Sequence, residues 1–258
     1  MKKIILFFSV VALVSCNDRV KPSGNEISME RPVGEFSALE VHSAIRATVT
    51  TGDTPHLVVT ADDNILPYIE TYTRGGTLIV KIRKNTSIKG EATLKVDIQT
   101  TGLNDVAGHG ASSLLFPDGL IADDLKVELH GASRWEGGIT TKTLNASLSG
   151  ASVITADGGA SVGLVLSCAG ASCFNRDGYG FSADVVNANL AGASEAKVTV
   201  GSTLNVNASG ASRLSYKGDP QVTKNTSGGS VVEQVTELAL KTPAIRAGVF
   251  SMRHLTGS

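Results

Sequence analysis

The chain has 258 residues, of which 41% are hydrophobic, 18% charged and 5% aromatic, and its formal net charge is −1. The apolar content is that of a folded protein, which excludes disorder over the whole length. A near-zero charge without a run of basic residues argues against nucleic acid as a partner. The length fits one or two domains, and one elongated all-β domain is compatible with it.

The N-terminus has the pattern of a secretory signal. Two lysines precede an apolar run over residues 4–14, which is shorter than the roughly 20 residues of a transmembrane helix and has the length of a signal-peptide core. The run ends in Leu13-Val-Ser-Cys16, which resembles the lipobox of bacterial lipoproteins. The resemblance implies a signal peptide over 1–15 and lipid attachment at Cys16, which would anchor the protein to a membrane. The alternative is an ordinary secretory peptide with an incidental cysteine.

The two segments that flank the folded part carry no periodic pattern. Residues 16–35 are polar and contain proline and glycine, so we predict a flexible tether that holds a domain away from the membrane. Residues 236–258 continue none of the columns described below and form a C-terminal tail of uncertain structure.

The part between them is a repeat. The triplet Gly-Ala-Ser recurs at intervals of 18 to 22 residues, and a degenerate copy follows. The glycines of the triplets and of the degenerate copy are Gly110, Gly131, Gly150, Gly170, Gly192, Gly210 and Gly228. Apolar and polar residues alternate before each glycine, as in Leu144-Asn-Ala-Ser-Leu148, which indicates a strand with one buried face. A second apolar column begins four residues after the glycine and indicates another short strand.

Strands that recur at a fixed spacing pair most simply with their own copies. A coil that returns to the same sheet edge every turn, about 4.8 Å higher, aligns all the columns and buries them between neighbours. We therefore predict one all-β domain over 36–235, a right-handed parallel β-helix with coils of about 20 residues. Residues 36–100 lack the triplet but contain strand patterns, and we expect them to form irregular N-terminal coils that cap the core.

The serines of the triplets share the parity of the buried column that follows them. They are Ser112, Ser133, Ser152, Ser172, Ser194, Ser212 and Ser230. We expect them to point inward and to bond the backbone or one another. No histidine or acid recurs beside them to act as a base, so they are not predicted to be nucleophiles.

The combination of these features resembles one family. The lipobox, the opening with Gly52-Asp53, the repeated triplets and the closing segment over 223–230 are similar to the head-GIN-domain family of auto-transporter adhesins, lipoproteins of Bacteroidetes type. The resemblance implies a right-handed β-helix and a place in the cell envelope, at the outer membrane or cell surface or facing the periplasm. It brings no catalytic residues with it.

Two histidines form the first candidate site. His109 and His130 each precede the corner glycine on successive coils, which would place them about 5 Å apart. Such a pair could bind a metal or respond to pH. The sequence offers no evident third ligand, and the later coils have serine or alanine in this column. We therefore predict neither a metal nor a cofactor.

Two acids and two cysteines are further candidates. Asp157 and Asp177 lie seven residues after their glycines on neighbouring coils and could hold calcium or serve a polysaccharide lyase, but Asp-Gly is also an ordinary turn sequence. Cys168 and Cys173 are expected to face opposite sides of the wall and to remain free thiols.

The outward rows are rich in polar residues. Asn187, Asn189, Asn205 and Asn207 form a strip that could bind a glycan or a protein by repeated hydrogen bonds, or could simply be solvated. We predict a non-enzymatic, lipid-anchored envelope protein that binds a glycan or an envelope or host protein along one outer face. The alternatives are a β-helix enzyme that degrades polysaccharides and a structural scaffold without a ligand.

Overall fold

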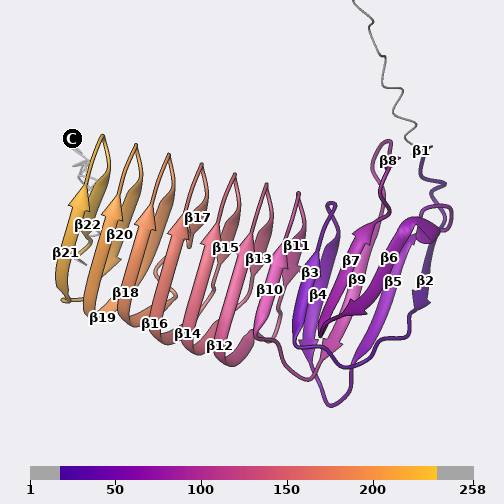
Figure 1. Ribbon diagram of the computed structural model, residues 1–258, viewed down its shortest axis with the longest axis horizontal. Coiled ribbons are helices and arrows are strands. Elements are labelled where there is room, and N and C mark those ends of the chain that lie inside the picture. The colour runs from indigo at the N-terminus through magenta and orange to yellow at the C-terminus, as the bar shows by residue number, and fades with distance from the viewer. Residues whose placement is uncertain (1–17, 237–258) are drawn as a thin grey trace, which may run out of the picture.

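The computed structural model describes residues 18–236, so the predicted signal peptide over 1–15, Cys16 and nearly all of the predicted tail lie outside the described residues. The described chain folds into β-strands with one 3-10 turn, η1 (Leu66–Tyr68), and contains no α-helix. Figure 1 shows the strands stacked along the long axis of the molecule. The all-β class is confirmed. Within residues 18–236, no helical segment is long and apolar enough to cross a membrane.

The strands fall into an N-terminal group and the group of the repeats. The first group consists of β1 (Asp18–Val20), β2 (Glu26–Glu30), β3 (Ala38–Val41), β4 (Arg46–Thr51), β5 (His56–Asp62), β6 (Ile69–Arg74), β7 (Thr77–Ile82), β8 (Thr86–Ile88) and β9 (Leu94–Thr100). The second group consists of β10 (Asp105–Gly108), β11 (Ser113–Leu115), β12 (Leu120–Leu129), β13 (Arg134–Glu136), β14 (Ile139–Leu148), β15 (Val153–Thr155), β16 (Gly159–Cys168), β17 (Cys173–Phe174), β18 (Ser182–Leu190), β19 (Glu195–Ala208), β20 (Arg213–Lys217), β21 (Gln221–Thr226) and β22 (Val231–Gln234).

The strands pair in parallel to form two walls. In spatial order the first wall is β7-β3-β10-β12-β14-β16-β18-β19-β21. The second wall is β9-β4-β11-β13-β15-β17-β19-β20-β22. Strand β19 belongs to both walls, because its first part pairs with β20 and its last part with β21.

The apolar columns are stacked in register. Leu144 pairs with Leu164, Leu164 with Val186, and Val186 with Leu204. All four side chains are 0% exposed, and each contributes about 1.5–3 kcal/mol relative to an exposed position. The column between the two walls is therefore the main source of stability. The prediction of a β-solenoid is confirmed, with about six turns of about 20 residues.

Glycine is needed at the corner between the walls for two reasons. Gly150 has a φ of +75°, and a Cβ atom on it would lie 2.4 Å from the carbonyl oxygen of Gly131 on the preceding coil. That carbonyl accepts a hydrogen bond from the N–H of Ala151 at 2.6 Å. The corner therefore requires both a left-handed backbone and an absent side chain.

The triplet serines point inward, as predicted. Ser112 donates to the hydroxyl of Ser133 at 3.2 Å, and Ser133 and Ser152 donate to the carbonyls of His130 and Ser149, both at 2.8 Å. Ser112, Ser133 and Ser152 are 0% exposed. No triplet serine in the described chain hydrogen-bonds a histidine ring or an acidic side chain, which agrees with a structural role.

The N-terminal coils differ from the repeats in order and direction. The coil of β3 and β4 lies between the repeats on one side and β7 and β9 on the other, so spatial order departs from chain order. Strand β5 pairs antiparallel with β9, and β6 pairs antiparallel with β7 through the Gly75-Gly76 turn. These antiparallel strands cover the end of the stack, where a parallel edge would otherwise be open for pairing.

The prediction of a flexible tether over 16–35 is wrong for part of that segment. Strand β2 pairs antiparallel with β5, with Ile27 opposite Ala61, and β1 pairs in parallel with β8. All five side chains of β2 are exposed, so this strand is held by backbone hydrogen bonds rather than by buried apolar side chains. A strand of this kind has no buried face to impose a period on the sequence.

Candidate functional site

The outward side chains of the first wall form three rows that run along the axis. Row 1 precedes the corner and contains His42, His109, His130, Ser149, Ala169, Ala191, Ser209 and Ser227. Row 2 lies two residues upstream and contains Glu40, Ala107, Glu128, Ser147, Ser167, Asn189, Asn207 and Asn225. Row 3 lies two residues further upstream and contains Ala38, Asp105, Lys126, Asn145, Val165, Asn187, Asn205 and Thr223.

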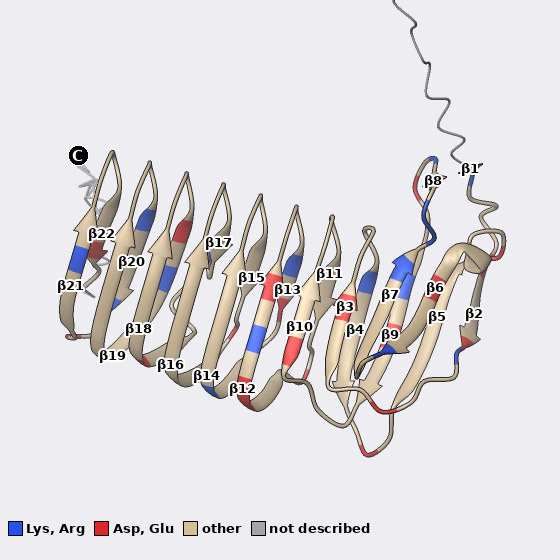
Figure 2. Cartoon of the chain, in the orientation of Figure 1, with Lys and Arg blue, Asp and Glu red and all other residues tan. Residues whose placement is uncertain are grey.

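Charge is concentrated at one end of this face. Lys126 lies 2.9 Å from Glu128 and 3.6 Å from Asp105, whereas β16 contains no charged residue. Figure 2 shows acidic and basic residues on β3, β10 and β12 and few on β14, β16 and β18. The face therefore has a charged, histidine-containing end and a longer neutral part rich in serine and asparagine.

Three histidines are stacked at the charged end. The ring centroids of His42 and His109 are 4.5 Å apart and those of His109 and His130 are 5.2 Å apart, with interplanar angles of 15° and 17°. Adjacent coils place each ring directly over the next, as predicted for His109 and His130. His130 is also bonded to Ser149, with 2.7 Å between Nδ1 and Oγ.

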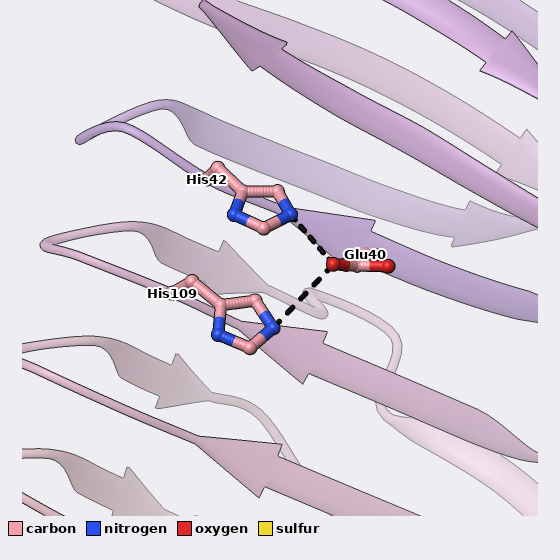
Figure 3. Close-up of side chains that lie close together, drawn as sticks. All are labelled: Glu40, His42 and His109. Atoms are coloured by element: carbon pink, nitrogen blue, oxygen red, sulfur yellow. Dashed lines mark hydrogen bonds and ion pairs between the residues drawn. The ribbon is translucent and has the colours of Figure 1, made fainter. Parts of the chain in front are cut away.

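The carboxylate of Glu40 lies beside the first two rings. Its Oε1 atom is 2.7 Å from His42 Nε2 and 3.6 Å from His109 Nε2, and Figure 3 shows both rings directed toward it. Within the described residues, Glu40, His42 and His109 are the only three His, Cys, Asp or Glu residues whose ligand atoms all lie within 4.8 Å of one another. The structure therefore groups His109 with Glu40 and His42 rather than with His130, which belongs to no such cluster in the described chain.

The pKa of His109 is lowered from its ordinary value. Burial is the main cause, and the neighbouring His42 adds to it, whereas the carboxylate of Glu40 acts in the opposite direction. Burial disfavours the charged imidazolium, and so does a second histidine stacked against it. His109 is accordingly biased toward the neutral form.

Sequence reasoning missed Glu40 and His42 because their coil lacks the Gly-Ala-Ser triplet. Ser43 occupies the corner position with a φ of +65°, where the repeats have glycine. A signal was present, since Leu39-Glu-Val-His42 has the same pattern as Val127-Glu-Leu-His130 at the end of β12. An alignment on the apolar alternation rather than on glycine would have found it.

A groove, the Asn-Ser groove, runs over the neutral part of the face between rows 1 and 2. It has a volume of about 480 Å³ and is lined by serine, asparagine and alanine together with the apolar Leu148, Cys168 and Leu190. Those from rows 1 and 2 are Ser147, Ser149, Ser167, Ala169, Asn189, Ala191, Asn207, Ser209, Asn225 and Ser227. The predicted asparagine strip therefore lies partly inside this groove and partly along its side.

The asparagines pair between coils. Asn205 donates to Asn187 at 3.0 Å, and Asn207 donates to Asn189 at 3.1 Å. An amide has two donors and an acceptor with two lone pairs, so each side chain retains capacity for further hydrogen bonds. The ladder fixes the orientation of the amides while they face solvent.

A second hollow lies over β11, β13 and β15 of the second wall and the turns that follow them. It has a volume of about 500 Å³, and its lining includes the carboxylates of Glu136, Asp157 and Asp177 and the guanidinium groups of Arg134 and Arg176. The predicted neighbours Asp157 and Asp177 therefore line the same hollow. Gly158, which follows Asp157, has a φ of +86°, in agreement with the turn role that the sequence indicated.

The two cysteines of the described chain are free, as predicted, and both are buried. Cys168 lies in the apolar column, and burial raises the pKa of its thiol to about 12. Cys173 lies on the outward row of β17 opposite Glu195, yet it is only 1% exposed. Burial also raises the pKa of Cys173, so both thiols are protonated at neutral pH.

A parallel β-solenoid with a long polar face is the class of protein that these features define. Residues 35–220 match the family described as "Putative auto-transporter adhesin, head GIN domain". The chain belongs to this family, as the resemblance predicted. Membership supports an adhesin-like, non-enzymatic role at the cell surface or in the envelope. No curated protein matches the chain.

Solved structures share this fold at low sequence identity. A "putative adhesin" from Bacteroides fragilis is 20% identical with a TM-score of 0.73, and the match covers 84% of this chain and 100% of that one. A "putative adhesin" from Parabacteroides merdae is 18% identical with a TM-score of 0.65, covering 85% and 100%. A "putative lipid binding protein" from Parabacteroides distasonis is 19% identical with a TM-score of 0.67, covering 85% and 100%.

Proposed function

We propose that this protein is a lipid-anchored, non-enzymatic binding module of the cell envelope and that its ligand is a glycan chain held along the Asn-Ser groove. The observation that carries the proposal is the pair of asparagine ladders beside and within that groove. Amides donate and accept, as sugar hydroxyls do, so an ordered row of amides is complementary to a row of hydroxyls.

The spacing of the coils supports an extended ligand. Neighbouring strands are about 4.8 Å apart, which is close to the length of one sugar residue, so successive coils can offer similar contacts to successive sugars. Repeated weak contacts add up along a chain, whereas a single small molecule would use only one or two of them. The neutral character of β16 favours an uncharged glycan.

A glycan array tests this proposal. The full chain carrying Cys16→Ser is applied to the array, and affinity for any glycan that binds is compared with that of an Asn189→Ala/Asn207→Ala double variant. Loss of two hydrogen bonding groups should weaken binding about tenfold, because each bond contributes about 0.5–1.5 kcal/mol. The control is Asn145→Ala, which lies in row 3 on β14 outside the groove lining. Absence of glycan binding, or equal affinity of the double variant, would contradict the proposal.

The second hollow favours a different candidate, a polysaccharide-degrading enzyme. Three carboxylates and two arginines line it, and a lyase needs a base together with groups that neutralise an acidic sugar. Incubation with polyuronates, with detection of newly formed unsaturated ends, distinguishes the two functions. We expect no turnover; turnover that Asp157→Asn abolishes would replace the binding proposal with the enzyme.

The anchor is tested separately from the ligand. Cells that express the full chain are grown with a labelled fatty acid, and the Cys16→Ala variant is expected to lose the label because the acceptor sulfur is gone. Cys173→Ala is the matched control, since that thiol is buried in the folded domain, and it should retain the label. Label that persists in Cys16→Ala would show that the protein is not lipidated at this residue.

A further inference from the structure

We propose that Glu40, His42 and His109 form a binding site for a divalent transition metal ion of the Zn²⁺ type on the outward face of the first wall. The ligands would be the Nε2 atoms of both histidines and a carboxylate oxygen of Glu40. This site is separate from the Asn-Ser groove, and its existence does not depend on the proposed function.

The donor set and the distances suit such an ion. Zn²⁺ binds imidazole nitrogen at about 2.0–2.1 Å and carboxylate oxygen at about 2.0–2.2 Å, so tetrahedral ligand atoms lie roughly 3.3 Å from one another. The Glu40 oxygen is 2.7 Å from His42 Nε2 and 3.6 Å from His109 Nε2. These two separations bracket the required value, and one ligand atom from each of the three residues lies within 4.8 Å of the other two, so the ligand atoms are already near the positions that an ion requires.

The fold holds the three ligands in place from two adjacent coils. Glu40 lies at the end of β3 and His42 directly follows that strand, while His109 follows β10. Strands β3 and β10 pair in register, and the N–H of His109 donates to the carbonyl of Val41 at 2.9 Å. Both imidazoles already direct Nε2 toward the carboxylate (Figure 3). Little ordering entropy is therefore lost when an ion binds.

The cluster is accessible and keeps one side open. The side chains of Glu40, His42 and His109 are 33%, 28% and 33% exposed, so an ion can enter from solvent. Three protein ligands leave a fourth position for water or for a donor from a binding partner, which is the arrangement of an open rather than a closed structural zinc site. His130 is stacked on the far side of His109, its Nδ1 atom is hydrogen-bonded to Ser149, and it is not a member of the cluster.

Calorimetric titration with ZnCl₂ tests the site. The full chain carrying Cys16→Ser is used, so that the remaining cysteines are the two buried ones of the folded domain. We expect saturable 1:1 binding, weakened at least tenfold by His42→Gln and by His109→Gln. Replacement of Zn²⁺ by Co²⁺ should give visible absorption bands that both variants lose.

The matched control is His130→Gln, which removes the third stacked histidine and should leave the affinity for Zn²⁺ within about twofold of the parent. Thermal unfolding of each variant without metal checks that the fold is intact, and the partly exposed positions of the ligands predict little change. The proposal is overturned if the chain shows no saturable Zn²⁺ binding, if both variants bind as tightly as the parent, or if His130→Gln weakens binding as much as they do.

Discussion

Replacing Trp135 by alanine is expected to lower the free energy of unfolding by about 3–5 kcal/mol. Trp135 is 0% exposed in the middle of the second wall, between Leu114 and Ile154 of the adjacent coils. Its ring stacks on Phe116 with a centroid distance of 3.9 Å, and its indole N–H donates to the carbonyl of Gly137 at 3.0 Å. The alanine variant would leave a large cavity in the core between the two walls. The surrounding coils cannot close this cavity without losing their register.

Chemical denaturation and thermal melting measure this loss. For a chain of this size, the melting temperature should fall by roughly 6–20 °C. Trp135→Phe retains the stacking on Phe116 and should lose less stability than the alanine variant. Ile121→Ala is the surface control, because Ile121 is 78% exposed and its removal should change stability by less than about 0.5 kcal/mol. Similar losses for Trp135→Ala and Ile121→Ala would contradict the assignment of Trp135 to the core.

Replacing Gly150 by alanine is expected to destabilise the protein by about 2–5 kcal/mol. The positive φ of Gly150 costs a residue with a side chain about 1–2 kcal/mol. The 2.4 Å approach to the carbonyl oxygen of Gly131 adds a steric cost of about 1–3 kcal/mol, because the coils must move apart to relieve it.

Gly76→Ala separates the two causes. Gly76 has a φ of +78°, close to the +75° of Gly150, but a Cβ atom there would meet nothing within 4 Å. The Gly76 variant should therefore show only the conformational cost, and the difference between the two variants measures how tightly the corners are stacked. Equal destabilisation by the two substitutions would mean that the corner glycines do not stack in contact.

The repeats could be predicted from sequence because packing imposes the same demand on every coil. Each coil must supply apolar side chains at the same positions, so Leu144, Leu164 and Leu204 recur at a constant distance from their glycines. The corner glycines and inward serines recur for the same reason. The sequence period therefore arises from the contacts between successive turns.

The N-terminal part could not be predicted to the same depth because its contacts are not periodic. The coil of β3 and β4 stacks between strands that are distant in the chain. A fixed spacing between repeats does not predict such an insertion. Strand β2 is held through its backbone with exposed side chains, so it leaves no hydrophobic pattern. These are the regions where the end of a solenoid must be closed by special structure.

The candidate sites follow the same division. The asparagine strip was visible in the sequence because it lies on consecutive repeats, with Asn187 and Asn205 in one row. Of the three stacked histidines, only His109 and His130 were recognised from the sequence, because His42 lies on the inserted coil next to His109. Glu136 lies at the end of β13 and joins Asp157 and Asp177 in the second hollow, whereas Asp157 and Asp177 lie in the segments that follow β15 and β17, and the course of such connecting segments is not encoded in column spacing.

The central claim is that the Asn-Ser groove is the ligand-binding surface, and the side-chain amide resonances of its asparagines report on it most directly. Heteronuclear NMR spectra of the isotopically labelled full chain, carrying Cys16→Ser, are recorded during titration with a glycan that binds on the array. We predict that the side-chain amide signals of Asn189 and Asn207 shift progressively and saturate, while the signal of Asn145 stays unchanged. Shifts confined to residues around Asp157 and Asp177, with the groove asparagines unaffected, would contradict the claim.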